Sequence, residues 1–250
     1  MATPQVTPLP IVELRQYALR PGKREVLIDH FDREFVESQE ALAISVIGQF
    51  RDIDDPDRFV WLRGFPDMAT RAEALQGFYG GPVWKLHRDA ANATMIDSDN
   101  VLLLRPAHVQ TGFLPDAGAR PSRGAGGDDT GLVIATIYSL DPSAVDDVVG
   151  VFSRDIEPTI IDGGATVLGL FLTEESSNNF PALPIREGES VFVWFAGFGD
   201  AGRGLSWSDR HNVLEPSPAH SRTIQQLQTL RLAPTARSRL SGLSGARRTG

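Results

Sequence analysis

The chain of 250 residues contains no cysteine. This absence excludes disulfide bonds, thiolate nucleophiles and cysteine-based metal sites, and it fits a cytoplasmic location. The sequence also has no run of about 18 apolar residues, the length that a membrane-spanning helix needs, so we expect no membrane partner. The first ten residues have neither a basic start nor an apolar core, and they do not resemble a secretory signal.

Several signatures of catalysis are missing as well. The sequence has no HExxH, no histidine pair at i,i+4 and no clustered Asp, Glu and His with the spacing of metal ligands. It also has no glycine-rich phosphate loop followed by Lys-Ser/Thr, and no Gly-x-Ser-x-Gly elbow. These absences count against metallohydrolases, nucleotide-binding enzymes and serine hydrolases, and we expect no cofactor.

Charge is spread unevenly along the chain. The net charge is −8, but residues 234–250 contain four arginines and no acid, so residues 1–233 carry −12. An acidic body argues against nucleic acid as a partner. The Gly/Ser-rich basic end cannot bury a core, so residues 234–250 are predicted to be a disordered tail, with docking to an acidic partner as the alternative. Residues 1–10 are also predicted to be disordered.

What the chain does contain is one pattern written twice. Residues 11–19, IVELRQYAL, correspond to residues 132–140, LVIATIYSL, at an offset of 121 residues. Further along, residues 59–65, FVWLRGF, match residues 192–198, FVWFAGF, at an offset of 133. A pattern that keeps its register in this way indicates two copies of one fold unit.

The two offsets differ by 12 residues, which indicates an insertion in the second copy between residues 173 and 190. Asparagine, proline and glycine residues are frequent in this segment, and they favour turns and interrupt helices and strands. The segment is therefore predicted to be a mobile excursion whose loss would change stability little.

Apolar periodicity in the first copy predicts elements in the order βαββαβ, the ferredoxin-like unit. The predicted strands are residues 11–19, 44–51, 59–65 and 101–105, and the predicted helices are residues 23–36 and 67–79, with a further helical stretch at 84–93. Helices cover only one face of such a sheet, so the other face needs a partner, which the second copy supplies. The predicted fold class is α+β, with two ferredoxin-like repeats packed into one barrel and the helices outside.

The predicted organisation follows from these patterns. Repeat 1 covers residues 11–106 and repeat 2 covers residues 131–233. Residues 107–130, which are rich in glycine, proline and aspartate, are predicted to be a flexible linker. The chain is expected to be a monomer with an internal pseudo-dimer, or a homo-oligomer.

Three motifs of the first copy resemble those of a known family. They are ELRxY at residues 13–17, FVWLxGF at residues 59–65 and FYxxPxW at residues 78–84. With these motifs, residues 11–105 resemble the NIPSNAP family of the dimeric α+β barrel superfamily, while the second copy lacks the first and third motifs. The resemblance implies the barrel fold but no single activity, because the superfamily includes cofactor-independent monooxygenases, haem-degrading enzymes and plain binding modules.

Candidate site residues lie where the two copies differ. Glu13, Arg15 and Tyr17 share one face of their strand, and Trp61 and Arg63 share one face of theirs. The two strands are central neighbours in a ferredoxin-like sheet, so these side chains are expected to meet. The second copy replaces the three charged residues together, by Ile134, Thr136 and Ala196.

The joint loss of three charges has two interpretations. One is a buried Arg–Glu–Arg ion network that holds the sheet, in which removal of one partner would strand a charge. The other is a pocket in which an arginine binds a carboxylate or another anion beside Trp61 and Tyr17. Both aromatic residues recur in the second copy, which fits packing as well as stacking on a flat ligand. His30 borders the apolar face of the first helix, either as an interface group or as a proton acceptor for a cavity.

Three functions remain open at this point. The first is a barrel that binds or transforms a small hydrophobic, aromatic or anionic molecule without metal or nucleotide. If it is an enzyme, it is of the cofactor-independent oxygenase or isomerase type and uses Arg15, Tyr17 and His30. The second is a non-catalytic protein-interaction module with a filled core, and the third is a haem-binding protein with His30 or His87 as axial ligand.

Overall fold

The computed structural model describes residues 7–115, 120–123, 131–211 and 224–242. The strands of the first half are β1 (Ile11–Leu19), β2 (Ser45–Asp52), β3 (Arg58–Phe65) and β4 (Met95–Pro106), and its helices are α1 (Arg24–His30), α2 (Val36–Glu40), α3 (Met68–Gly80) and α4 (Pro82–Asn92). The second half contributes β5 (Leu132–Leu140), β6 (Thr166–Thr173), β7 (Ser190–Phe198) and β8 (Ile224–Pro234), with the helices α5 (Val145–Val151), α6 (Glu157–Asp162) and α7 (Ala201–Arg210).

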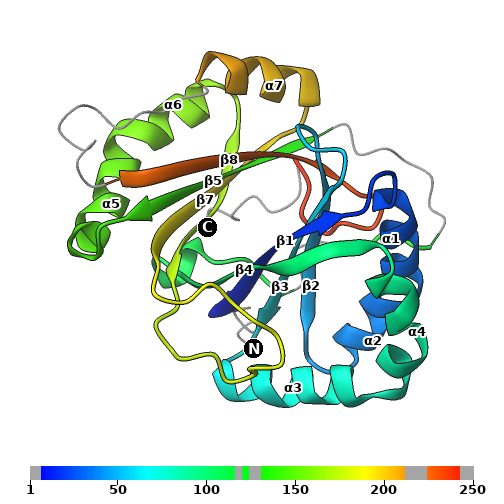
Figure 1. The fold of residues 1–250 in the computed structure, drawn as a ribbon. Coiled ribbons are helices and arrows are strands. Elements are labelled where there is room, and N and C mark those ends of the chain that lie inside the picture. The colour runs from blue at the N-terminus through cyan, green and yellow to red at the C-terminus, as the bar shows by residue number, and fades with distance from the viewer. Residues whose placement is uncertain (1–6, 116–119, 124–130, 212–223, 243–250) are drawn as a thin grey trace, which may run out of the picture.

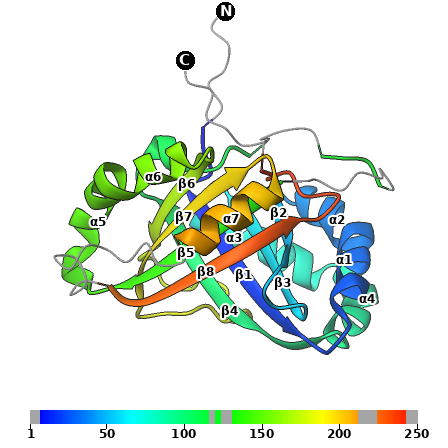
Figure 2. The same ribbon diagram turned by 90° about the horizontal axis from the view of Figure 1, so that it is seen from above.

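The eight strands close into one antiparallel barrel in the order β1-β3-β2-β8-β5-β7-β6-β4. Each half supplies four adjacent strands in the ferredoxin-like arrangement, and the pairs β2–β8 and β4–β6 join the halves. Helices of both halves lie on the outside of the strands (Figures 1 and 2). The predicted fold class, a dimeric α+β barrel within one chain, is confirmed.

Local irregularities repeat along with the strands. A π-helical turn at Phe31–Phe35 joins α1 to α2, and an equivalent turn at Phe152–Ile156 joins α5 to α6, 121 residues later. The β2–β3 register shifts between Val46 and Gly48, and the β6–β7 register shifts at the positions equivalent to these. The first helical segment extends to Glu40, beyond the predicted end at residue 36, because the π-helical turn continues it without a break.

Helix starts are equivalent in the two halves as well. Asp67 caps α3 by accepting a hydrogen bond from the Thr70 backbone N–H, and Asp200 caps α7 by accepting one from Arg203. The predicted strand at residues 101–105 begins earlier, at Met95, because its N-terminal part pairs with β1.

Alternation along the strands divides the core into three layers. Side chains that point into the barrel come from both halves and form one shared cluster, which includes Val12 and Leu14 of β1 and Val133 of β5. Side chains that point outward lie under the helices of their own half, in one separate cluster per half. Burial of a large apolar side chain contributes about 1.5–3 kcal/mol, so the shared cluster is a main reason why the halves stay together.

Segments predicted to be disordered or flexible take part in this core. Phe113, in the predicted linker, lies in the shared cluster, and so does Leu240, in the predicted basic tail. Leu9, in the predicted N-terminal segment, is also buried there. One residue of each predicted irregular segment therefore packs into the core, while the bounds and the flexibility of these segments stay predictions, and residues 1–6, 116–119, 124–130 and 243–250 lie outside the described residues.

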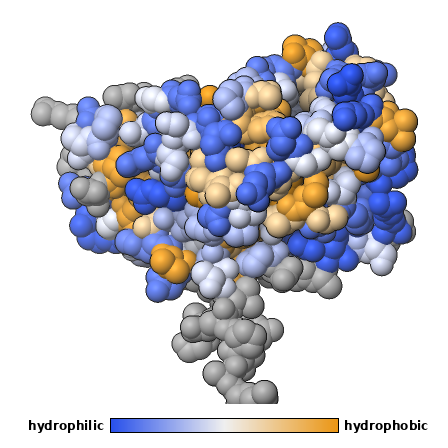
Figure 3. Space-filling view, turned by 90° about the horizontal axis from the view of Figure 1, so that it is seen from below, coloured by the Kyte–Doolittle hydropathy of each residue, from blue (hydrophilic) through white to orange (hydrophobic). Residues whose placement is uncertain are grey.

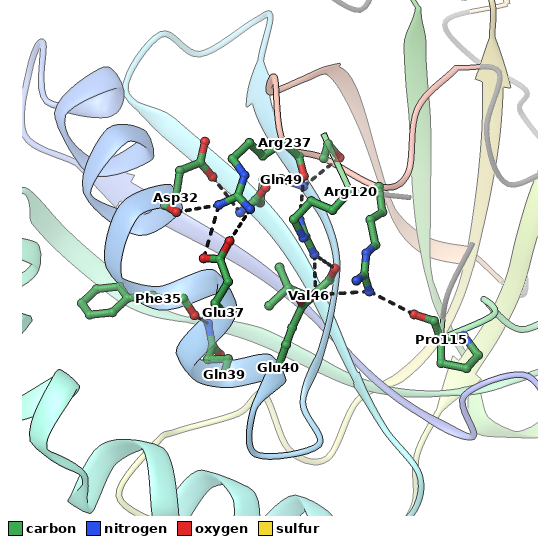
Figure 4. Close-up of polar contacts among 12 residues, drawn as sticks. Asp32, Phe35, Glu37, Gln39, Glu40, Val46, Gln49, Pro115, Arg120 and Arg237 are labelled. Carbon is green, nitrogen blue, oxygen red and sulfur yellow. Dashed lines mark hydrogen bonds and ion pairs between the residues drawn. The ribbon is translucent and has the colours of Figure 1, made fainter. Parts of the chain in front are cut away.

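Arginines fix the tail and the linker to the first half (Figure 4). Arg237 donates from Nη1 to the Asp32 carbonyl at 2.7 Å, and its Nη2 binds the Glu37 carboxylate. Arg120 donates to the Arg237 carbonyl at 2.6 Å and to Glu40 at 2.7 Å. These bonds hold the chain after β8 against the π-helical turn and α2.

Within the described residues, every helix is too short or too polar to cross a lipid bilayer.

Candidate functional site

The pairing of β1 with β3 sets the charged residues face to face. Glu13 lies opposite Arg63, and Arg15 lies opposite Trp61, in the layer between the sheet and the helices. Tyr17 follows on the same face, opposite Phe59. The predicted meeting of these side chains is therefore what the structure shows.

Glu13 is the centre of a fully buried ion cluster. Its Oε2 accepts hydrogen bonds from Arg15 Nη1 and from Arg63 Nε, both at 2.7 Å. Its Oε1 accepts one from Arg71 Nε at 2.8 Å. The side chains of all four residues are at most 1% exposed. We call Glu13, Arg15, Arg63 and Arg71 the ion cluster.

Arg71 is the member that sequence reasoning missed. It lies on α3 in the stripe of buried positions that continues with Ala74, Leu75 and Phe78. An arginine at such a position needs a buried partner, because an unpaired buried charge is strongly destabilising. The interruption of an apolar stripe by an arginine was the signal that could have revealed it.

The ion cluster contains three cations and one anion. Burial alone would raise the pKa of Glu13, but the guanidinium groups of Arg63, Arg15 and Arg71 outweigh burial and hold that pKa far below its ordinary value. No other carboxylate forms an ion pair with these arginines among the described residues. The cluster therefore has a net charge of about +2 at neutral pH.

A cavity of about 260 Å³ lies beside the ion cluster. Its lining is Arg15, Tyr17, Tyr79, Trp84, Asn92, Met95, Ser98, Phe180, Ala182 and Leu183. Four of these side chains are aromatic, and they come from β1, α3, α4 and the insertion of the second half. The cavity therefore offers flat apolar walls with one guanidinium group among them.

The insertion of the second half forms one wall of this cavity. Arg71 Nη1 donates to Asn179 Oδ1 at 2.6 Å and to Asn178 Oδ1 at 3.2 Å, and Phe180 stacks on Tyr79 with 5.9 Å between ring centroids. Asn179 also donates to the Met68 carbonyl at 2.5 Å. The predicted excursion is therefore docked on the first half, while its mobility and its effect on stability stay predictions.

His30 lies apart from the cavity lining. Its Nε2 is 3.1 Å from the His87 carbonyl, which can only accept, so Nε2 carries the hydrogen. Its Nδ1 is then the acceptor for Arg33 Nη2 at 3.3 Å. No histidine is among the described residues that line the cavity. The structure brings Arg15 and Tyr17 to the cavity, places Glu13, Trp61 and Arg63 in the buried layer beside it, and leaves His30 aside.

Within the described residues, the second half has only a small hollow at the equivalent strand positions. Its strands have the same register, with Thr136 opposite Trp194 and Tyr138 opposite Phe192. The remaining hollow there measures only about 10 Å³ and is lined in part by Trp207, which stands where the first half has Ala74. Gly204 stands in place of Arg71, so the fourth charge of the ion cluster is missing along with the other three.

A larger hollow of about 380 Å³ lies between the ends of β6 and β7 and the insertion. Its described lining contains no aromatic side chain, and its charged residues include the ion pair of Arg186 with Glu189. Within the described part of the chain, no group of three or more His, Cys, Asp or Glu side chains is placed to hold a metal ion. The cavity beside the ion cluster therefore remains the candidate site.

Comparisons with known proteins agree with this architecture. Residues 12–110 match the NIPSNAP family model, so the first half of the chain is a NIPSNAP domain. A provisionally named monooxygenase from Fusobacterium nucleatum is similar over 96% of this chain and 98% of its own, with 10% identity and a TM-score of 0.57. One from Lactobacillus acidophilus is similar over 90% of this chain and 94% of its own, with 9% identity and a TM-score of 0.55.

An anthrone oxidase-like protein is also similar, over 96% of this chain and 98% of its own, with 10% identity and a TM-score of 0.51. At these identities the three structures show the fold alone, and all three share it over almost their whole length. No curated protein matches the chain.

Proposed function

We propose that this chain binds a small aromatic molecule in the cavity of its first half. One observation carries the proposal: the first half has a cavity of about 260 Å³, whereas the described residues at the equivalent strand positions of the second half border a hollow of about 10 Å³. Ligand pockets typically measure about 300–1,000 Å³, so this cavity suits a molecule of one or two rings. Tyr17, Tyr79, Trp84 and Phe180 provide the walls on which such a ring can stack.

The proposed reaction class is a cofactor-independent oxygenation or isomerisation of that molecule. The names of the similar full-length structures, two provisionally named monooxygenases and an anthrone oxidase-like protein, support this class. Such chemistry begins when the ligand loses a proton to solvent water and becomes an anion, and in an oxygenation this anion is then oxidised by molecular oxygen. Glu13 is not suited to take that proton, because its two oxygens already accept three hydrogen bonds and its pKa is far below the ordinary value. The role proposed for the protein is to orient the ligand and stabilise its charge.

Two other functions have less support. On the face in Figure 3, apolar side chains are interspersed with hydrophilic ones, so that face offers no continuous apolar surface for a protein-interaction module. A haem ligand would need a histidine beside the cavity, but His30 is bonded to the His87 carbonyl and to Arg33, and His87 pairs with Glu34 at 3.3 Å.

The proposal is tested by measuring thermal stabilisation with one-ring and two-ring aromatic compounds, followed by calorimetry for those that act. A ligand at about 100 times its dissociation constant should add about 2.7 kcal/mol to stability. Ser98→Trp places a bulky ring in the cavity and should abolish the effect, since Ser98 lines it.

Asp99→Trp is the matched control, because Asp99 is the next residue of β4 and is exposed outside the cavity lining. It should bind as the original chain does. If no compound stabilises the protein, or if Ser98→Trp binds as well as the control, the proposal is wrong.

A further inference from the structure

We infer that the cavity recognises its ligand through a negatively charged oxygen, held by Arg15, Tyr17 and Tyr79. This inference rests on the proposed function and specifies the class of ligand: an aromatic molecule that carries a phenolate, enolate or carboxylate oxygen. Charge balance, hydrogen-bond donors and the comparison of the two halves support it independently.

Charge balance is the first argument. The ion cluster buries three guanidinium groups against one carboxylate, and the polar side chains that complete it are neutral: Tyr17, Gln39, Tyr79, Asn178 and Asn179. Excess buried charge is costly unless an opposite charge comes close. Arg15 is the member of the ion cluster that also lines the cavity, so an anion bound there would lie next to the excess positive charge.

The donors that face the cavity give the second argument. Arg15 uses Nε for the Tyr17 hydroxyl at 3.1 Å and Nη1 for Glu13, and within the described residues its Nη2 has no hydrogen bond. The Tyr17 hydroxyl accepts from Arg15, and the Tyr79 hydroxyl accepts from Arg63 at 3.4 Å. Each hydroxyl therefore keeps its own hydrogen to donate.

Tyr17 stays protonated at neutral pH. Burial raises its pKa above the ordinary value of a tyrosine, although the Arg15 guanidinium acts in the opposite direction. Arg15 Nη2 and the two phenol groups thus form a set of hydrogen-bond donors, and no acidic side chain occurs in the described cavity lining. A ligand group that only accepts, and that carries negative charge, matches this set.

The second half gives the third argument. It keeps the tyrosine and the tryptophan of the motif, as Tyr138 and Trp194, but it lacks the four charged residues, and its described residues border only a hollow of about 10 Å³ at these positions. Packing of the sheet against its helices is thus achieved there without any ion cluster. The charges and the larger cavity occur together in one half, whereas the described part of the other half has neither, as expected if they serve one ligand.

The test uses 4-nitrophenol, whose phenolate has its own absorption band, and 4-nitroanisole, its neutral methyl ether. The full-length protein should bind the phenolate at least about tenfold more tightly than the ether, and the pKa of bound 4-nitrophenol should fall by about one unit or more. Titration of the phenolate absorbance from pH 5 to 9, with and without saturating protein, measures this fall.

Arg15→Gln and Tyr79→Phe should each reduce the fall in pKa while leaving 4-nitroanisole bound. Both variants are expected to fold, because Glu13 keeps Arg63 and Arg71 in the first, and the ring that stacks on Phe180 is kept in the second. Circular dichroism checks folding, and Tyr138→Phe in the second half is the matched control that should leave the binding of both probes and the fall in pKa unchanged.

The possible failures are distinct. If 4-nitroanisole binds as tightly as the phenolate, or if bound 4-nitrophenol keeps the pKa that it has in free solution, charge recognition is wrong and the aromatic site stands. If neither probe binds to the folded protein, the proposed function fails and this inference falls with it.

Discussion

The two halves of the barrel share a backbone and differ in one layer. Strand registers, the β2 and β6 bulges, the π-helical turns and the aspartate caps all recur at equivalent positions. Between sheet and helices, however, the first half has an ion cluster and a cavity, and the second half has apolar side chains and Trp207. The comparison separates residues that specify the barrel, which recur, from residues that specify a site, which do not.

One pair of aromatic residues shows how the charges changed the local bonding. In the second half, Trp194 Nε1 donates to the Tyr138 hydroxyl at 3.4 Å. In the first half, Arg15 Nε takes the equivalent hydroxyl of Tyr17, and the Trp61 Nε1 group has no hydrogen-bond partner among the described residues. An arginine beside the tyrosine has thus replaced a neutral bond with a charge-assisted one, which is about twice as strong.

Removal of the central carboxylate should give the largest difference in stability between equivalent changes in the two halves. Glu13→Ile, which introduces the residue of the second half, strands three buried guanidinium groups and should destabilise the protein by about 4 kcal/mol. Urea denaturation measures the loss. The matched change Ile134→Val should cost only about 1 kcal/mol, and a similar cost at both positions would contradict the role of the ion cluster.

Replacement of the whole ion cluster by residues like those of the second half tests whether Arg71 depends on Glu13. The triple variant Glu13→Ile, Arg15→Thr, Arg63→Ala leaves Arg71 buried without a carboxylate and should remain destabilised by about 3 kcal/mol. Addition of Arg71→Ala should recover most of that loss. A triple variant as stable as the quadruple one would show that Arg71 does not depend on Glu13.

Acid should destabilise the original chain more than the quadruple variant, which lacks Glu13. The pKa of Glu13 is lowered in the folded state from an ordinary value of 4.5, so its contribution is fully present above about pH 4.5 and is lost as pH falls below it. The original chain should lose on the order of 2 kcal/mol more than the quadruple variant between pH 5 and pH 2. Urea midpoints measured across that range test this, and parallel curves for the two proteins would refute it.

The docked insertion should matter for stability, contrary to the expectation from sequence. Phe180→Ala removes a partly buried ring that stacks on Tyr79, and it should cost about 1.5 kcal/mol. Glu187→Ala, on an exposed part of the same insertion, should stay within about 0.5 kcal/mol of the original chain. Thermal denaturation distinguishes the two, and equal midpoints would mean that the insertion contributes nothing.

The smallest difference should come from the two tyrosines. Tyr17→Phe deprives Arg15 Nε of its acceptor in a buried setting and should cost about 1.5 kcal/mol. Tyr138→Phe loses only the long bond from Trp194 and should cost about 0.5 kcal/mol. If the second change costs as much as the first, the charge-assisted bond adds nothing.

The features that could be predicted from the sequence are those that depend on local periodicity or on the internal repeat. Strand alternation placed Glu13, Arg15 and Arg63 on the same face of two adjacent strands, and the repeat predicted one barrel built from both halves. Contacts between distant segments were beyond it. Arg71 meets Asn179 across 108 residues of sequence, and no local pattern encodes that contact.

The burial of single residues in irregular segments could not be predicted from composition for a related reason. Gly, Pro and Ser content correctly indicated that residues around 113, 180 and 240 form few regular elements. It did not show that one apolar residue in each, Phe113, Phe180 and Leu240, packs against a core. A single buried ring or aliphatic side chain is enough to fix an irregular segment. The average composition of the segment does not reveal such a residue.

The strand that closes the barrel, β8, lies near the end of the chain and is therefore among the last parts to be synthesised. β8 completes the ring by pairing with β2 at Phe50–Asp52, and the chain after it adds a bond from the Leu240 N–H to the Ile47 carbonyl. On the ribosome, β2 therefore waits with an unpaired edge until nearly the whole chain has emerged, and such edges invite association with other chains. A product cut short before Pro234 would keep that edge open, so premature termination would yield an aggregation-prone chain and not merely a shorter barrel.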